Sequence, residues 1–499
     1  MTKGFVCTSD YPVVETKAGK VRGFELNDIF HFYGMTYGTA KRWEMPVETE
    51  KWEGVKDALS YGYICHPLNP ETPNGDLFVP HRFWPNSEDC LNLNVWTPSI
   101  DVNAKKAVMV WIHGGLYSNG SSLEMIAYDG RNLCEYGDVV VVSINHRLNV
   151  FGHLDVSAYG EKYWNSQNVG IADLVLALQW VHDNIAKFGG DPENVTVFGQ
   201  SGGGNKIGAL MQTDAANGLF HKAIIESGSG GSPMSRRGDS NADIAQAMLK
   251  ELHADSIDAL LALDKDELVA LANKVCPMGI VKFKPCPNGW FKQWILDGST
   301  DHAKTVPLLI GTCMAEQAGM RKIVPDKAVL SKEEQEALVI AEYGEENGKK
   351  LLELFYKAYP GHDPITALQV DDGFRTSTQM ILDNRAKENA VTYNYMFAHE
   401  FAVDGGHPAW HCSDIPFVFR NIDKVAYAAE AGTGEYLQEC FSNAFINFAK
   451  TGDPNNAYMP KWQPYTSNHE ETMVIDNVCE ARVSLDRELV KLHLEGKKR

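Results

Sequence analysis

Short runs of apolar, largely β-branched residues are the feature that most constrains how this chain folds. They stand well apart along the sequence, at 107–112, 139–144, 195–198, 222–225, 306–310 and 391–397. Runs that are apolar at almost every position are typical of strands that are buried on both faces of a sheet. The chain therefore has the strands of one large buried sheet.

The spacing between these runs predicts the class of fold. From Gly170 to Phe188, apolar residues recur at helical spacing, and Gly189-Gly190-Asp191-Pro192 then ends the helix. This gives a strand, a helix and a strand in succession. Repetition of that unit predicts an α/β fold with a doubly wound, mainly parallel sheet, in which ligands gather at the carboxyl ends of the strands. Alternation of polar and apolar residues from Val13 to Gly38 predicts antiparallel hairpins before the main sheet.

Two insertions interrupt the strand rhythm, at about 229–280 and about 320–390, and both are rich in helix-forming residues. In the second, Ser331 and Glu334 form a possible capping box, and Pro360 ends a later helix. Segments added at the catalytic edge of a sheet usually wall a pocket. We expect the insertions to select the substrate.

The strand predicted at 195–198 leads directly into Gly199-Gln200-Ser201-Gly202-Gly203, and a helix is predicted from Gly204 to Met211. A strand, a sharp turn and a helix together force a serine into an exposed, strained position, and glycines allow the strand and helix to approach. An isolated motif of this kind is usually a plain turn. In this setting the sequence indicates that Ser201 is a nucleophile.

A serine nucleophile that transfers acyl groups needs N–H donors for the negative oxygen of its transition state. Gly202 supplies one, since its N–H follows the nucleophile directly. His113-Gly114-Gly115-Leu116 follows the strand at 107–112 and can turn further amides, those of Gly115 and Leu116, toward Ser201. A simple tight turn would use the same glycines, but two motifs of one mechanism occur here in the expected order.

Composition excludes several other classes of function. The formal net charge is -19 and the basic residues are scattered, so nucleic acid is not an expected partner. The sequence has neither the layout of a secretory signal at its start nor a run of eighteen apolar residues, so no membrane association is expected. The ten cysteines show no metal-binding spacing. We expect a cytoplasmic enzyme with reduced thiols; the oligomeric state and any removed signal peptide stay open.

Several further segments resemble the type B carboxylesterase family, which includes the cholinesterases. They span most of the chain: Ser87 to Val95, Asn145 to Gly152, Trp180 to Gly203, Phe448 to Pro454 and Trp462 to Tyr465. The resemblance implies the α/β-hydrolase fold, with residues 1–499 as a single domain. It also implies a catalytic triad of serine, glutamate and histidine in that chain order.

The matching triad residues are Ser201, Glu316 and His411. Glu316 follows the strand at 306–310, but Cys313 and Ala315 replace the family's usual Asn and Asp, and a solvated loop glutamate is the alternative. His411 has the family's spacing to Pro416-Phe417-Val418-Phe419, whereas His407 in the same loop is a rival base. Ser227 resembles a family serine that supports the triad, with a strand-end cap as the alternative.

Departures from the family pattern bear on specificity. Gln200 replaces the usual Glu beside the nucleophile, and Trp84 does not keep the cholinesterase register, so a cholinesterase is disfavoured. Leu116 stands where Gly or Ala is usual, and its side chain should narrow the adjoining pocket. Cys65 and Cys90 match a family disulfide pair, although the same positions can stay reduced.

These observations predict a serine carboxylic-ester hydrolase that acts on small to medium esters through an acyl-enzyme, with no metal or organic cofactor. Two alternatives are left open. One is a non-catalytic adhesion or binding protein of the same fold, and the other is an amidase or transacylase that uses the same triad.

Overall fold

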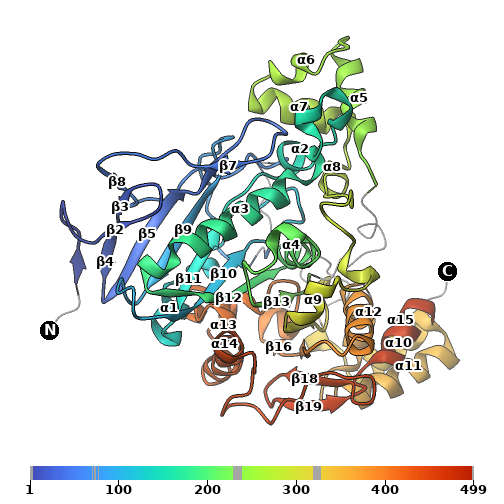
Figure 1. Cartoon of the computed structure of the whole chain (residues 1–499). Helices are drawn as coiled ribbons and strands as arrows, with labels where there is room; N and C mark the ends of the chain where they lie inside the picture. The colour runs from blue at the N-terminus through green and yellow to red at the C-terminus, as the bar shows by residue number, and fades with distance from the viewer. Residues whose placement is uncertain are drawn as a thin grey trace.

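The structure is a computed structural model that describes residues 4–69, 71, 75–76, 78–228, 239–318, 327–371 and 373–496, without the side chain of Asp404. In this part of the chain, twelve strands form one sheet (Figure 1). In spatial order they are β1 (Phe5–Val6), β4 (Phe24–Leu26), β5 (Ile29–Thr36), β9 (Asn92–Thr97), β11 (Val140–Ile144), β10 (Lys106–Ile112), β12 (Gly190–Gln200), β13 (Lys222–Glu226), β14 (Leu308–Cys313), β15 (Thr392–Phe397), β18 (Glu471–Ile475) and β19 (Glu480–Val483).

The centre of the sheet is parallel and its margins are antiparallel. Strands β11, β10, β12, β13, β14, β15 and β18 pair in parallel from neighbour to neighbour. The pairs β1–β4, β4–β5, β5–β9, β9–β11 and β18–β19 are antiparallel. This confirms the predicted mainly parallel sheet with antiparallel strands before it. Smaller sheets join β2 (Val13–Glu15), β3 (Lys20–Arg22) and β8 (Val55–Asp57); β6 (Gly38–Thr39) and β7 (Val47–Glu48); and β16 (Glu400–Phe401) and β17 (His407–Pro408).

Alternate residues of the central strands enter two separate cores. In β10, Val108, Val110 and Ile112 belong to one apolar cluster, whereas Met109 and Trp111 belong to the other. Because successive side chains of a strand point to opposite faces, both faces of the sheet are covered. Helices α3 and α4 contribute to the first cluster, and α1 and α14 to the second.

The helices divide into those that cover the sheet and those of the insertions. The bounds are α1 (Arg131–Gly137), α2 (Asn149–Gly152), α3 (Val169–Asn184), α4 (Gly202–Met211), α5 (Ala242–Glu251), α6 (Asp258–Leu261), α7 (Lys265–Val275), α8 (Gly279–Lys282), α9 (Asp301–Thr305), α10 (Lys332–Tyr343), α11 (Glu345–Ala358), α12 (Phe374–Lys387), α13 (Ile415–Val418), α14 (Thr433–Thr451) and α15 (Arg487–Gly496). Figure 1 shows α5 to α7 projecting from the body, and α10, α11 and α15 grouped at another side.

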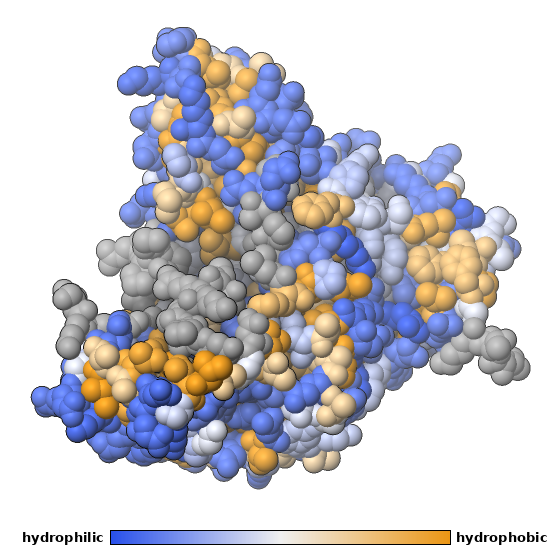
Figure 2. All heavy atoms as spheres, turned by 180° about the vertical axis from the view of Figure 1, so that it is seen from behind, coloured by the Kyte–Doolittle hydropathy of each residue, from blue (hydrophilic) through white to orange (hydrophobic). Residues whose placement is uncertain are grey.

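Both insertions are helical where the structure describes them; 229–238 and 319–326 lie outside the described residues. The capping box of Ser331 and Glu334 is confirmed, since each side chain bonds the backbone N–H of the other residue. Helix α11 ends at Ala358, just before Pro360 as predicted. Seen from the opposite side in Figure 2, the α5–α7 lobe stands clear of the rest and carries both hydrophilic and hydrophobic residues.

Some predicted boundaries were wrong. The strand expected from Val306 begins at Leu308, directly after Pro307, which has no N–H to donate to a neighbouring strand. Strand β12 begins at Gly190, within the segment 189–192 that was predicted only to end the helix, because Gly190 already pairs with Lys106 of β10. The helix after Ser201 begins at Gly202, two residues earlier than expected.

All ten cysteines are free thiols in the structure, including the buried Cys65 and Cys90. None of the helices in the described ranges is long and apolar enough to cross a membrane.

Candidate active site

The parallel strands bring the predicted site residues to one edge of the sheet. His113 follows β10, Ser201 follows β12, Ser227 follows β13, and Glu316 lies just beyond β14. Because these strands run in the same direction as neighbours, their carboxyl ends lie side by side. Residues separated by more than two hundred positions in the sequence therefore share one small region.

Ser201 occupies the sharp turn between β12 and α4. Its backbone has φ 57° and ψ -122°, which is a strained conformation for a residue other than glycine. The turn is held on both sides, because the N–H of Ser201 donates to the carbonyl of Glu226 at 2.8 Å and the N–H of Asn205 donates to the carbonyl of Ser201 at 3.1 Å. The predicted strand, turn and helix are confirmed.

Gly202 is packed directly against the backbone of Leu116. A Cβ atom at position 202 would lie 2.2 to 2.5 Å from the carbonyl oxygen, nitrogen and Cα of Leu116. Only glycine allows this approach. It brings the loop after β10 onto the turn that carries Ser201.

Two successive residues of that loop have a positive φ. Gly115 and Leu116 have φ of 85° and 55°, and the carbonyl of Gly115 accepts the N–H groups of Ser118 and Asn119. Within the described residues, the N–H groups of Gly115 and Leu116 donate to no carbonyl, and Gly202 is the first residue of α4, where N–H groups have no acceptor within the helix. These three amides are available to a negatively charged oxygen.

Glu316 is fully buried and its carboxylate is surrounded by donors. Oε1 accepts the hydroxyl of Ser227 at 2.6 Å and the backbone N–H of Cys313 at 2.8 Å. Oε2 lies 2.5 Å from Nδ1 of His411, and the backbone N–H of His411 also donates to the carbonyl of Glu316 at 3.1 Å. Glu316 is therefore not a solvated loop residue, and its carboxylate contacts the imidazole of His411.

The ring of His411 is fixed from two further directions. Phe374 of α12 stacks on it, with 4.9 Å between ring centroids and 28° between planes. The side-chain nitrogen of Gln200 lies 3.3 Å from both ring nitrogens, while its oxygen accepts the thiol of Cys412. In the described structure Ser201 makes no hydrogen bond with His411, and such contacts are often loose before a substrate binds.

The rival base, His407, is directed elsewhere. It lies in β17, its Nδ1 is 3.1 Å from the carbonyl of Pro408, and its ring packs edge-on against Trp410. The structure therefore brings His411, and not His407, to Glu316.

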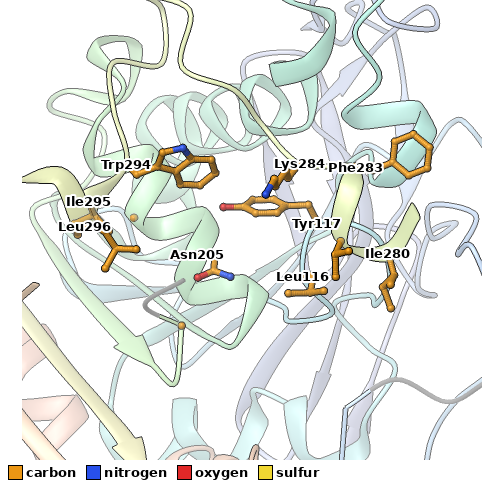
Figure 3. A pocket seen from close by; sticks show the side chains of 12 residues that line it. Leu116, Tyr117, Asn205, Ile280, Phe283, Lys284, Trp294, Ile295 and Leu296 are labelled. Atoms are coloured by element: carbon orange, nitrogen blue, oxygen red, sulfur yellow. The ribbon is translucent and has the colours of Figure 1, made fainter. Parts of the chain in front are cut away.

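Beside this site lies a pocket whose empty volume, together with the open solvent at its mouth, is about 520 Å³ (Figure 3). Two of its residues lie against the carbonyl oxygen of Ser201. The N–H of Asn205 donates to that oxygen, and a Cβ at Gly228 would lie 2.6 Å from it. Its lining consists of Leu116, Tyr117, Asn205, Gly208, Gly228, Ile280, Val281, Phe283, Lys284, Trp294, Ile295 and Leu296. Of the described residues of the first insertion, only the last, Ile280, lines the pocket. The second insertion reaches the site through Phe374, which stacks on His411.

A model of the carboxylesterase family matches residues 10–492 of this chain. The chain belongs to the carboxylesterase family. The protein is thus an enzyme that hydrolyses carboxylic esters.

Several relatives of this carboxylesterase are named as esterases. Para-nitrobenzyl esterase of Bacillus subtilis is 34% identical over 94% of this chain and 95% of its own length. Fumonisin B1 esterase of Sphingopyxis macrogoltabida is 30% identical over 92% of this chain and 85% of its own. A solved esterase of Clostridium hathewayi, described as able to hydrolyse aliphatic aromatic polyesters, is 44% identical with a TM-score of 0.94 and covers 99% of this chain and 100% of that one. The α/β-hydrolase fold is thereby confirmed.

Two buried carboxyl groups near Ser227 and His411 were missed from the sequence. Glu226 and Asp414 are both fully buried, and Asp414 accepts the hydroxyl of Tyr395 at 3.0 Å. Burial, reinforced by the charge of Glu316, raises the pKa of Asp414 to about 7, and burial raises that of Glu226 well above its ordinary value. Glu226 directly precedes Ser227 and Asp414 follows His411 by three residues, and these positions in the sequence could have pointed to them.

Proposed function

We propose that this carboxylesterase uses Ser201 as nucleophile, His411 as general base and Glu316 as the acid that orients the base. The observation that carries the proposal is the chain of contacts from the buried Glu316 carboxylate to Nδ1 of His411. With Nδ1–H held by the carboxylate, Nε2 is the unprotonated nitrogen that can take a proton.

The reaction proceeds in two steps. His411 removes the proton of Ser201 as Oγ attacks the ester carbonyl, and then protonates the leaving alcohol as the carbon–oxygen bond breaks. Water, activated by His411, attacks the acyl-enzyme and releases the acid. Gln200, whose amide lies 3.3 Å from the ring, keeps His411 beside the turn that carries Ser201.

The amides of Gly115, Leu116 and Gly202 form the proposed oxyanion hole. Their support is the close approach of residues 116 and 202 and the free N–H groups in the described loop. Fixed donors of this kind stabilise the developing charge more than water does, because they need no reorientation during the reaction.

Small to medium esters are the proposed substrates, with their acyl part in the apolar pocket. The support is the pocket's contact with Ser201 through Asn205 and Gly228. The 44% identical polyester-hydrolysing esterase makes esters of aromatic acids suitable first substrates. The ten free thiols support a reducing compartment such as the cytoplasm.

Substitution of the nucleophile tests this proposal. In Ser201→Ala, kcat for a p-nitrophenyl ester is expected to fall roughly a millionfold, since the whole covalent pathway is lost. The exposed Ser240 provides a matched control, and Ser240→Ala should keep the wild-type rate. If the Ser201→Ala variant kept most of the wild-type activity, Ser201 would not be the nucleophile.

A further inference from the structure

The pocket beside Ser201 has polar groups at the end away from the nucleophile. In Figure 3, Leu116 and Asn205 lie at one end, Trp294 and Lys284 at the opposite end, and the hydroxyl of Tyr117 points into the space between. A pocket that served only aliphatic acyl groups would need neither a cation nor a phenol there.

Tyr117 places a buried donor in this space. Only 5% of the residue is exposed, its hydroxyl has no hydrogen-bond partner among the described residues, and its ring packs edge-on against Trp294 with centroids 6.4 Å apart. A buried hydroxyl without a partner is unfavourable, and a bound acceptor would remove that penalty.

Lys284 places positive charge in the same wall. The residue is 8% exposed. Burial and, to a smaller extent, the charge of Lys282 lower the pKa of its ammonium group, although the charges of Asp239 and Cys286 oppose that effect. Its backbone is anchored, since the carbonyl of Lys284 accepts the amide of Gln167 at 3.1 Å. A partly desolvated ammonium group favours an anion that pairs with it.

We propose that the pocket binds an acyl group in which an aromatic ring separates the ester carbonyl from a carboxylate, as in a half-ester of a benzene dicarboxylic acid. The ring would pack among Leu116, Trp294 and Leu296, and the carboxylate would accept from Tyr117 and pair with Lys284. The proposal rests on the proposed function, because the ester carbonyl must reach Ser201. The bond that breaks joins the carbonyl carbon to the alcohol oxygen, and water supplies the oxygen that replaces it.

Two esters of the same size test the proposal: the mono-4-nitrophenyl ester of terephthalic acid and 4-nitrophenyl 4-methylbenzoate. We expect wild-type kcat/KM to favour the carboxylate by at least tenfold, and Lys284→Met to lower that ratio by about tenfold, as expected for a lost partly buried ion pair. Tyr117→Phe should lower the ratio of the two kcat/KM values severalfold, and it provides a second variant if Lys284→Met does not fold. Lys282→Met is the matched control, because Lys282 is exposed and does not line this pocket.

An equal ratio in wild type, Lys284→Met and Lys282→Met, or a wild-type preference for the methyl compound, would overturn the proposal. Failure of the proposed function has a different signature. Ser201→Ala would then still hydrolyse both esters, whatever their ratio.

A separate observation concerns Lys206, which lies on α4 five residues after Ser201 and has no exposed surface. Its ammonium group donates to the carbonyl of His113 at 2.9 Å and to that of Gly114 at 3.4 Å. Burial lowers the pKa of Lys206 to about 7, because desolvation disfavours the charged form, and the nitrogen carries N–H donors for these carbonyls whether or not it is charged. The carbonyl of Gly114 and the N–H of Gly115 belong to one peptide group.

We infer that Lys206 is a positioning residue of the proposed oxyanion hole. It holds the loop 113–116 against Gly202, and by polarising the Gly114 carbonyl it makes the N–H of Gly115 a stronger donor. This inference also rests on the proposed function, since that loop must face the reacting carbonyl.

The test separates transition-state binding from substrate binding. In Lys206→Met we expect kcat to fall at least tenfold with KM changed less than twofold, and the affinity for a trifluoromethyl ketone to fall by the same factor as kcat. Lys206→Gln provides a second variant, and Lys222→Met, which removes another largely buried lysine on β13, is the matched control. An unchanged kcat, or an equal loss of affinity for the substrate and for the ketone, would overturn the inference. Fluorophosphonate labelling at a serine other than Ser201 would instead refute the proposed function.

Discussion

Replacement of Glu316 by glutamine isolates the orienting role of this carboxylate, because it changes one oxygen into an NH2 group and little else. Oε1 accepts from both Ser227 and Cys313, so the amide oxygen should occupy that position. The amide nitrogen then faces Nδ1 of His411, which must become an acceptor. The proton moves to Nε2, and His411 can no longer accept the proton of Ser201. A wrong tautomer of this kind lowers kcat about ten-thousandfold, which corresponds to a loss of about 5.5 kcal/mol of transition-state stabilisation.

The assay is steady-state hydrolysis of a p-nitrophenyl ester by wild type and Glu316→Gln, with circular dichroism and the melting temperature as tests of folding. KM should change little, because the carboxylate does not touch the substrate. A folded Glu316→Gln variant that kept more than a tenth of the wild-type kcat would refute the reasoning, since another group would have to orient His411.

Three further outcomes follow. Ser227→Ala should lower kcat by about tenfold, because Glu316 keeps its contacts with Cys313 and His411 but loses a charged hydrogen bond. An unchanged kcat would show that Ser227 only caps the end of its strand and does not support Glu316. For Asp414, the pKa raised to about 7 means that the folded state binds a proton which the unfolded state releases near pH 4, so stability is lost as pH rises from 4 to 7. The melting temperature of Asp414→Asn relative to wild type should therefore increase across that interval and level off above pH 7, and a constant difference from pH 4 to 8 would contradict this. Leu116→Gly should speed the hydrolysis of tertiary-alcohol esters, which wild type should cleave poorly, and fast wild-type cleavage would exclude the steric role of Leu116.

Strand β10 could be predicted from the sequence, and strand β9 could not. Strand β10 lies at the centre of the sheet with every residue after Lys106 buried, so its composition alone identifies it. Strand β9 is equally buried but contains Asn92 and Asn94. The side chain of Asn94 donates to Ser143 on the neighbouring strand at 3.1 Å, and a contact of that kind is set by tertiary structure rather than by local pattern.

The same distinction applies to the site. Ser201 is identifiable locally, because a strand, a glycine-rich turn and a helix succeed one another within a few residues. Glu316 and His411 are 95 residues apart, so local pattern does not pair them, and the resemblance to a family was needed to do so. Tyr117 and Lys284 look in sequence like a core aromatic and a surface lysine, and only the fold brings both to the pocket.

Chemical labelling of the nucleophile tests the central claim most directly. A fluorophosphonate reacts with a serine whose hydroxyl is activated by a neighbouring base and whose new oxyanion is stabilised, so one reaction probes the whole proposed site. After proteolysis and peptide mapping, we expect one labelled residue, Ser201, with labelling abolished in His411→Ala and kept in His407→Ala. A label on another serine, or undiminished labelling of Ser201 in His411→Ala, would contradict the account.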